Sequence, residues 1–189
     1  MKLNNTYYIL RHGEAISNVK GICSCWPETF ENPLTESGVQ MINRAALELE
    51  DKGIQLIFAS DVLRTKQTAQ IVGKELNIKP KFDKRLREVD FGIMNGAPMA
   101  NLDMQFPHEK ERISRAMPKG ETYRDVHVRV YDFLRDMDEQ FQGKTILVVS
   151  HECPLLLLEA VVNGVSLGQL FNGFPRHERI RQGELKKLN

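Results

Sequence analysis

Short apolar runs alternate with longer amphipathic stretches along most of this chain. The apolar runs have the length and the β-branched content of buried strands. We expect strands at residues 7–10, 54–59, 80–83 and 145–149. Strands that alternate with helices are typical of a mostly parallel sheet with helices on both faces. The sequence therefore predicts an α/β fold.

Capping residues indicate where the helices begin. Thr35 and Thr122 suit the N-cap position, because a threonine oxygen accepts hydrogen bonds from amide groups of the first turn. Between these two, a second helix is expected after Asp61, and Pro154 fits the first turn of a later apolar helix that ends near Gly164. The face that the first helix is expected to bury carries Val39, Ile42, Ala46 and Leu49.

Residues 91–121 interrupt this regular pattern with several glycines and prolines. A connection of that length inside a compact domain is usually functional, often as a lid. We therefore expect a short insertion over about 91–121, which we call the cap segment. Its apolar side chains either form a rim around a site or simply pack: Met94, Met99, Leu102, Met104 and Phe106. One edge strand is expected in the polar tail, residues 174–189.

The composition narrows the possible partners. The length of 189 residues fits one domain spanning 1–189. A formal net charge of +1 leaves no broad field to hold nucleic acid or an anionic membrane, so any anion site must be local. No signal peptide is visible, and the most apolar later stretch, 145–165, contains charged residues and a proline. We expect no nucleic-acid or membrane partner; the sequence does not indicate the oligomeric state.

The three cysteines, Cys23, Cys25 and Cys153, cannot all pair in disulfides, and an odd number suits a reducing cytoplasm. Together with His151 they could bind zinc. However, C-x-C and H-x-C spacings match structural zinc sites poorly. We therefore expect a cytoplasmic protein without a metal.

Three of the predicted strands end in chemically active residues. Strand 7–10 runs into Arg11-His12, and strand 145–149 runs into Ser150-His151. Strand 54–59 runs into Ser60-Asp61, with Arg64 one helical turn later. Ligands of such sheets bind beyond the carboxyl ends of the strands. The sequence therefore predicts a site where two imidazoles and two guanidiniums converge.

This set of side chains is suited to phosphoryl transfer. Each guanidinium offers a planar fork of donors that matches the oxygens of a phosphate. A neutral imidazole nitrogen can act as a nucleophile and divide hydrolysis into two displacements. Its other nitrogen must then hold a proton, which we expect to be bonded to a backbone carbonyl. A carboxylic acid is also needed to protonate the leaving oxygen. Because the cations do the work of a metal, no cofactor is expected.

Five blocks of sequence, in order, resemble the histidine phosphatase (phosphoglycerate mutase-like) superfamily. They are Arg11-His12-Gly13-Glu14 with Asn18, residues 60–69, residues 86–92, residues 118–122 and residues 148–151. A lone R-H-G would be weak evidence, but five ordered blocks are not expected by chance. The resemblance implies a three-layer, doubly wound sheet with a cap insertion, which the cap segment matches by position.

The resemblance also implies roles for the residues in these blocks. His12 would be the nucleophile that becomes phosphohistidine. Arg11, Arg64 and His151 would hold the phosphoryl oxygens. Glu88 would be the general acid and then the general base.

Further substrate contacts follow from the same resemblance. Asn18 would add a neutral donor to the phosphoryl group. Ser24 and Cys25 stand where mutases of the family tend to have a Thr-Gly pair that contacts substrate, so Ser24 is an expected contact. Residues 93–96 also depart from the family, which commonly has an aromatic residue and a glutamate there. Both departures concern the identity of the substrate more than the chemistry.

Glu152 is the departure closest to the chemistry, since the family usually has glycine after its second histidine. If the side chain points into the pocket, it would repel phosphate and raise the pKa of His151. We favour the alternative, in which Glu152 points outward and lies at the positive end of a helix. The arginines of the tail are expected to form a solvated surface, with a place at the pocket rim as the alternative: Arg176, Arg179 and Arg181.

The favoured function is a phosphomonoester phosphatase that acts on a small phosphorylated metabolite through a phosphohistidine on His12. A cofactor-dependent phosphoglycerate mutase shares the first half of this reaction and is the first alternative. The second is a module that binds a phosphorylated ligand without catalysis. The short cap favours the phosphatase, because the insertions of true mutases are longer.

Overall fold

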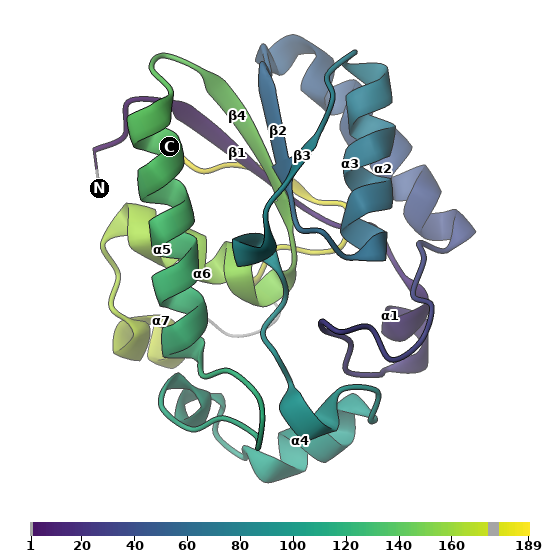
Figure 1. Cartoon of the computed structure of the whole chain (residues 1–189), viewed down its shortest axis with the longest axis vertical. Helices are drawn as coiled ribbons and strands as arrows, with labels where there is room; N and C mark the ends of the chain where they lie inside the picture. The colour runs from purple at the N-terminus through teal and green to yellow at the C-terminus, as the bar shows by residue number, and fades with distance from the viewer. Residues whose placement is uncertain (1, 174–177) are drawn as a thin grey trace.

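The computed structural model describes residues 2–173 and 178–189 of the chain. Within these residues, a five-stranded sheet has the strand order β3-β2-β4-β1-β5 (Figure 1). The first four strands in the sequence are parallel, and β5 pairs antiparallel with β1. The mostly parallel α/β sheet is thus confirmed, including the edge strand of the tail. The strands are β1 (Thr6–Arg11), β2 (Leu56–Ala59), β3 (Lys81–Phe82), β4 (Thr145–Ser150) and β5 (Leu185–Lys187).

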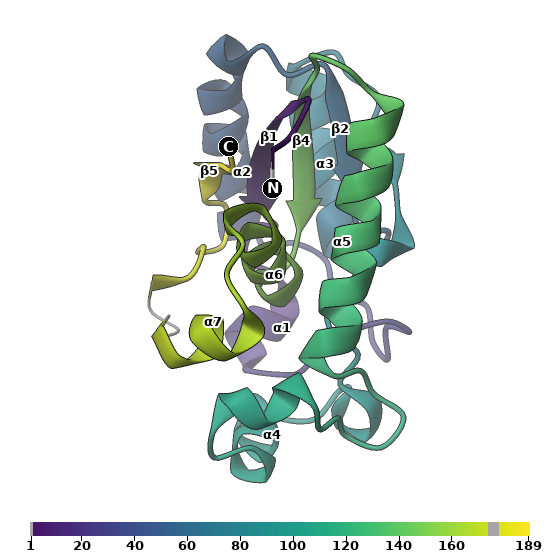
Figure 2. The same cartoon turned by 90° about the vertical axis from the view of Figure 1, so that its left-hand side faces the viewer.

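Helices cover both faces of this sheet, as the sequence predicts (Figure 1). α2 (Glu36–Leu49) and α3 (Leu63–Glu75) lie on one face, and α5 (Tyr123–Gln140) and α6 (Glu152–Asn163) lie on the other. The cap segment contains α4 (Met99–Gln105) and lies beyond the carboxyl ends of β1 and β4 (Figure 2). The short helices α1 (Ile16–Lys20) and α7 (Leu167–Gly173) have no counterpart in the sequence prediction.

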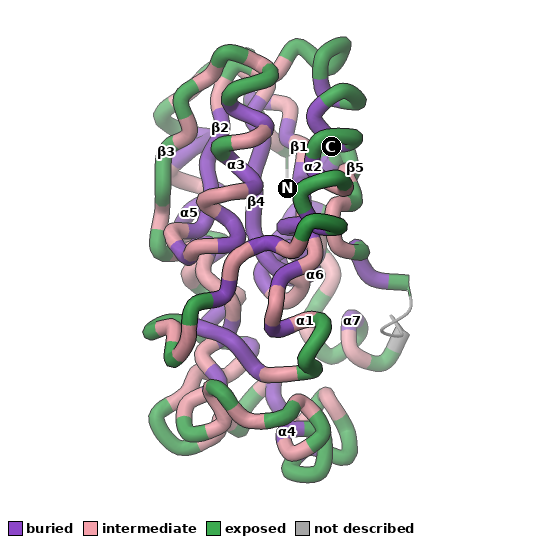
Figure 3. The backbone as a smooth tube through the Cα atoms, turned by 90° about the vertical axis from the view of Figure 1, so that its right-hand side faces the viewer, coloured by how far each residue is buried: buried purple, intermediate pink, exposed green. Residues whose placement is uncertain are grey.

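Alternation along the central strand β4 divides the core into two layers. Ile146 and Val148 belong to the layer between the sheet and α5 and α6. Leu147 and Val149 belong to the layer beneath α2 and α3. Because successive side chains of a strand point to opposite faces, one continuous apolar run supplies both layers. Figure 3 shows the resulting buried centre, with exposed residues concentrated on the outer helix faces and in the cap segment.

Local sequence signals set the helix ends. Thr35 accepts a hydrogen bond from the backbone N–H of Gly38 (2.9 Å) at the start of α2. Thr122 and Asp125 form the predicted reciprocal capping box of α5. Gly164, with φ of 65°, ends α6 in the left-handed region that favours glycine.

One predicted core position is wrong. Val39 is 37% exposed, whereas Ile42, Ala46 and Leu49 of the same helix are buried. Val39 lies in the first turn of α2, at the end of the buried stripe. The periodicity alone could not indicate how far the covered face extends.

Candidate active site

The carboxyl ends of β1, β2 and β4 meet at one edge of the sheet. Arg11, the last residue of β1, is in register with Ser150, the last residue of β4. His12 donates its backbone N–H to the oxygen of Ser150 (3.1 Å), and Ser60 donates to the oxygen of Val149 (3.0 Å). The predicted convergence of histidines and arginines at these strand ends is therefore present in the structure.

His12 is almost completely buried and is held in one tautomer. Its Nδ1 lies 2.7 Å from the backbone oxygen of Gly13, which can only accept, so the proton is on Nδ1. Its Nε2 accepts a hydrogen bond from Nε of Arg64 (3.2 Å). Burial, followed by the charges of Arg64 and Arg11, holds the pKa of His12 well below its ordinary value. The result is a neutral imidazole whose Nε2 carries a lone pair, as the sequence argument requires.

Close backbone packing fixes the loop that carries this histidine. A Cβ on Gly13 would lie 2.5 Å from the backbone oxygen of Gly38, and a Cβ on Gly38 would lie 2.0 Å from the oxygen of Glu14. Only glycine fits at either position, so the loop after β1 lies directly on the first turn of α2. Thr35 strengthens the contact by donating from its hydroxyl to Oε1 of Glu14 (2.7 Å).

Arg64 connects the two histidines. Besides its bond to His12, it donates from Nη2 to Nδ1 of His151 (3.1 Å). Since Nδ1 of His151 accepts, the proton is on Nε2, which lies 3.0 Å from the hydroxyl of Ser60. Burial, then Arg64, lowers the pKa of His151 well below its ordinary value. The two imidazole rings meet edge to face with centroids 5.1 Å apart.

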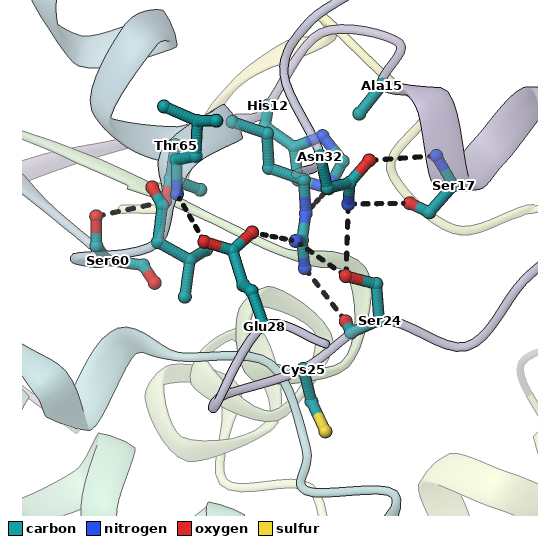
Figure 4. A network of polar contacts seen from close by, with 12 residues as sticks. His12, Ala15, Ser17, Ser24, Cys25, Glu28, Asn32, Ser60 and Thr65 are labelled. Carbon is teal, nitrogen blue, oxygen red and sulfur yellow. Dashed lines mark hydrogen bonds and ion pairs between the residues drawn. The ribbon is translucent and has the colours of Figure 1, made fainter. Parts of the chain in front are cut away.

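A loop between α1 and α2 also contacts Arg64 through Ser24 and Glu28, which Figure 4 labels. Arg64 donates from Nη2 to the backbone oxygen of Ser24 (3.0 Å) and from Nη1 to its hydroxyl (3.3 Å). That hydroxyl also accepts from Nδ2 of Asn32 (3.0 Å), and Asn32 in turn bonds Ser17. Glu28 lies 3.6 Å from Nη1 of Arg64 and accepts from the backbone N–H of Leu63 at the start of α3. The sequence prediction included Ser24 but not Asn32 or Glu28.

Glu88 lies in the same cavity as His12 and Arg64. Its Oε1 accepts from the backbone N–H of Val89 (2.9 Å). Burial raises the pKa of the Glu88 carboxyl, and the charge of Glu152 adds to this rise against the opposing effects of Val89, Arg64 and Arg11. A raised pKa favours the protonated acid, which is the form that can protonate a leaving oxygen.

The expected orientation of Glu152 is wrong. Its carboxylate lines the cavity, and its Oε2 accepts from Nη1 of Arg11 at 2.7 Å. The attraction of that guanidinium turns the side chain inward although it begins helix α6. The pKa rise that an inward Glu152 was expected to cause at His151 is absent, because burial and Arg64 lower that pKa instead.

The expected solvated position of Arg179 is also wrong. Arg179 is only 8% exposed and lines the cavity. It donates to both oxygens of Glu109 (2.9 and 2.8 Å) and to Oε1 of Glu152 (3.3 Å). Two carboxylates compensate the cost of burying its charge. Arg181 is exposed, as expected, and Arg176 lies outside the described residues.

Several of these side chains line a cavity of about 260 Å³. Arg11, His12, Asn18, Ser24, Arg64 and Glu88 line it. Asn18 accepts from the backbone N–H of Ala15 through Oδ1 (2.9 Å), so its amide hydrogens remain available as donors. His151 is fully buried and does not line the cavity, but it contacts Arg64, which does.

The cap segment contributes lining residues that the sequence prediction did not include. Glu109 and Arg112 enter the cavity from the cap, and Tyr123 enters from the start of α5. The guanidinium of Arg112 lies 4.4 Å from the centroid of the Tyr123 ring, a cation–π contact. Charged residues on an irregular segment give no periodic signal. Only the position of Glu109 and Arg112 within the expected cap segment could have indicated that they lie near the site. Of the apolar cap side chains, Met99 lines the cavity and Met104 is 70% exposed.

The thiols lie in separate environments. Cys23 contacts Met99, and Cys25 donates to Oδ1 of Asp90 (3.4 Å). Burial raises the pKa values of Cys23 and Cys25 to about 11 and about 12. Across residues 2–173 and 178–189, no three histidine, cysteine or acidic side chains are grouped to hold a metal ion. No helix in the same ranges has the length and apolar character needed to span a bilayer.

Comparisons with known proteins found one matching family model and several similar proteins. The model of the histidine phosphatase superfamily (branch 1) matches residues 7–177. The "Probable phosphoglycerate mutase GpmB" of Yersinia pestis (strain Pestoides F) is 27% identical over 198 residues, which cover 96% of this chain and 83% of that protein.

Two solved structures have the same fold at similar identity. Bacillus stearothermophilus YhfR superposes with a TM-score of 0.81 at 27% identity, covering 96% of this chain and 89% of that one. The alpha-ribazole phosphatase from Shigella flexneri superposes with a TM-score of 0.78 at 25% identity, covering 95% and 88%.

Proposed function

Because the chain belongs to the histidine phosphatase superfamily (branch 1), we propose that it is a phosphomonoester phosphatase that forms a phosphohistidine on His12. One observation carries this assignment. The Nδ1 proton of His12 is committed to a backbone carbonyl, which leaves the Nε2 lone pair beside Arg64 in a cavity that also contains Glu88. A candidate nucleophile, a cation for the phosphoryl oxygens and a carboxyl group whose pKa is raised therefore line one cavity, which supports the proposal.

In the first step, Nε2 of His12 attacks the phosphorus atom of the monoester. The bond between phosphorus and the ester oxygen breaks as the nitrogen–phosphorus bond forms, and Glu88 gives its proton to the leaving alcohol. Arg11 and Arg64 stabilise the charge on the equatorial phosphoryl oxygens. A phosphoryl oxygen would replace Nε2 of His12 as the acceptor of the Arg64 Nε–H bond.

In the second step, water attacks the phosphohistidine. Glu88, now ionised, takes a proton from this water, and the nitrogen–phosphorus bond breaks to release phosphate and neutral His12. A bound phosphoryl group also adds negative charge beside His151 and favours its protonation. Nδ1 of His151, which accepts a hydrogen bond from Arg64 in this structure, then becomes a donor to a phosphoryl oxygen.

The cavity of about 260 Å³ supports a small phosphorylated metabolite as the substrate, with Asn18 and Ser24 as further contacts. The alpha-ribazole phosphatase among the similar structures is consistent with hydrolysis. The relative described as a phosphoglycerate mutase favours a second candidate, in which the phosphoryl group returns to substrate.

Free thiols at Cys23, Cys25 and Cys153 support a cytoplasmic location.

The assignment is tested by release of inorganic phosphate from an aryl phosphate and from a panel of phosphorylated metabolites. The wild-type protein should release phosphate and carry an acid-labile, base-stable phosphoryl group after rapid quenching. His12→Ala should do neither, while the exposed control His108→Ala should retain both activities.

Two results would redirect the assignment. Equal background rates for the wild-type protein and His12→Ala would indicate a module that binds a phosphorylated ligand without catalysis. Conversion of 3-phosphoglycerate to 2-phosphoglycerate in the presence of a bisphosphate primer, without free phosphate, would identify a mutase instead.

A further inference from the structure

Glu152, the first residue of α6, lies between two arginines. Its Oε2 accepts from Nη1 of Arg11 at 2.7 Å, and its Oε1 accepts from Nη1 of Arg179 at 3.3 Å. Its side chain is 30% exposed and lines the cavity, while that of Arg11 is 12% exposed. The shorter and better of the two contacts is therefore made to the arginine at the end of β1, which the proposed reaction needs for phosphate.

We propose that Glu152 is an internal competitor of phosphate for Arg11, and that it weakens the binding of the phosphate product so that phosphate leaves faster. This inference rests on the proposed function, because it takes Arg11 as part of the phosphate-binding site. It concerns a residue that acts through Arg11, so Glu152 is a positioning residue and not a catalytic one.

The competition follows from charge. A phosphate bound to Arg11 places its negative oxygens next to the Glu152 carboxylate, and like charges a few ångströms apart in a partly buried cavity repel. Binding of phosphate must therefore displace Oε2 of Glu152 or bear this repulsion. By linkage, any affinity that Glu152 has for Arg11 reduces the affinity of phosphate for the same guanidinium.

The surroundings allow this exchange without leaving a charge unpaired. Arg11 keeps its second bond from Nη1, to the backbone oxygen of Ile180 (3.0 Å), when the carboxylate moves away. Glu152 keeps Arg179 as its partner, which Glu109 holds in place with two hydrogen bonds. Arg179 thus offers the displaced carboxylate of Glu152 a second position beside the phosphate-binding arginines.

The test measures inhibition by inorganic phosphate in the wild-type protein, Glu152→Gln and Glu152→Gly. Both variants should lower the inhibition constant of phosphate about 5- to 150-fold, the range of a typical coupling between two ligands. KM for an aryl phosphate should fall with it, and kcat should fall where product release limits turnover. A merely structural ion pair would instead leave phosphate affinity equal or weaker.

Glu159→Gln is the matched control. Glu159 also lies on α6 and forms an ion pair, with Lys186, but it does not line the active-site cavity. Its substitution should leave the inhibition constant of phosphate unchanged. A decrease in this control equal to that in Glu152→Gln would mean that loss of any α6 carboxylate is sufficient, and would overturn the proposal.

Arg179→Gln tests the second position of the carboxylate. Without Arg179, Glu152 should stay on Arg11 and phosphate should bind more weakly than in the wild-type protein. The double variant Arg179→Gln with Glu152→Gln should bind phosphate as tightly as Glu152→Gln alone, because Arg179 has no carboxylate to hold when Glu152 is absent. If the two substitutions are instead additive, Arg179 acts on phosphate independently of Glu152, and the exchange between the two arginines is refuted.

The outcomes separate this inference from the proposed function. A wild-type protein that neither hydrolyses phosphomonoesters nor binds phosphate refutes the proposed function. An active wild-type protein whose Glu152→Gln and Glu152→Gly variants bind phosphate no more tightly refutes only the competition.

Discussion

Replacing Asn32 with alanine should weaken both the fold and the active site, although Asn32 does not touch the cavity. Asn32 is fully buried. It accepts from the backbone N–H of Ser17 (2.8 Å) and donates to the hydroxyls of Ser17 (2.9 Å) and Ser24 (3.0 Å). Figure 4 shows these bonds converging on Asn32 between the two serines.

The magnitude follows from these contacts. Each of the three hydrogen bonds contributes about 1 kcal/mol, and the buried N–H of Ser17 loses its acceptor, so the free energy of unfolding should fall by about 2–4 kcal/mol. For a chain of this size this corresponds to a melting temperature lower by roughly 5–15 °C. The hydroxyl of Ser24 loses the hydrogen bond from Asn32 and keeps only the one from Arg64. Ser24 should then hold the guanidinium of Arg64 less firmly, and kcat/KM should fall about 10- to 100-fold because that guanidinium is misplaced.

Denaturant unfolding and steady-state hydrolysis of an aryl phosphate, both at a temperature where the variant is folded, measure the two effects separately. The exposed Asn163→Ala serves as the control and should change the free energy of unfolding by less than about 0.5 kcal/mol. An Asn32→Ala protein with wild-type stability would refute the energetic argument. Wild-type kcat/KM in the folded variant would show that the loop does not position Arg64.

Glu88→Gln should slow the hydrolysis of alkyl phosphates more than that of aryl phosphates, because only poor leaving groups need a proton; equal slowing would remove Glu88 from the acid role. With an alkyl phosphate, wild-type kcat/KM should fall as the pH rises through the raised pKa of Glu88, and this limb of the pH profile should be missing in Glu88→Gln. The lowered pKa of His12 keeps its imidazole neutral, so aryl phosphatase activity should persist below pH 6.5, and a loss at that pH would contradict the assigned environment. Thr122→Ala removes the N-cap of α5 and should cost about 1 kcal/mol of unfolding free energy at unchanged kcat, as measured by denaturant unfolding; an equal cost in Asp132→Ala on the same helix would argue against a capping effect.

Arg11, His12, Arg64 and His151 could be placed together from the sequence because each follows a strand or lies one turn beyond it. Parallel strands bring their carboxyl ends to one edge, so a local pattern was enough to predict a spatial one. Glu88 has no such position and was identified only by resemblance. Its cavity position and raised pKa come from the packing around it.

Glu152 and Arg179 illustrate what local patterns cannot indicate. A residue in the first turn of a helix can point outward or toward a neighbouring strand end, and both directions are compatible with the same sequence. The direction was decided by Arg11 from β1 and by Arg179, which is 27 residues further along the chain. Asn32 and Glu28 lie on an irregular loop, where no periodicity distinguishes a buried polar side chain from a solvated one.

The sequence by itself determined the alternation of strands and helices, the caps that begin α2 and α5, and the strand ends that carry the histidines and arginines. These features depend on contacts within a few residues or on the fixed direction of parallel strands. Only the tertiary structure decided which charged side chains face the cavity and which carboxylate contacts each arginine. The physical reason is that the partner of a buried charge comes from a distant part of the chain, and the free energy of that pairing exists only after the segments have packed together.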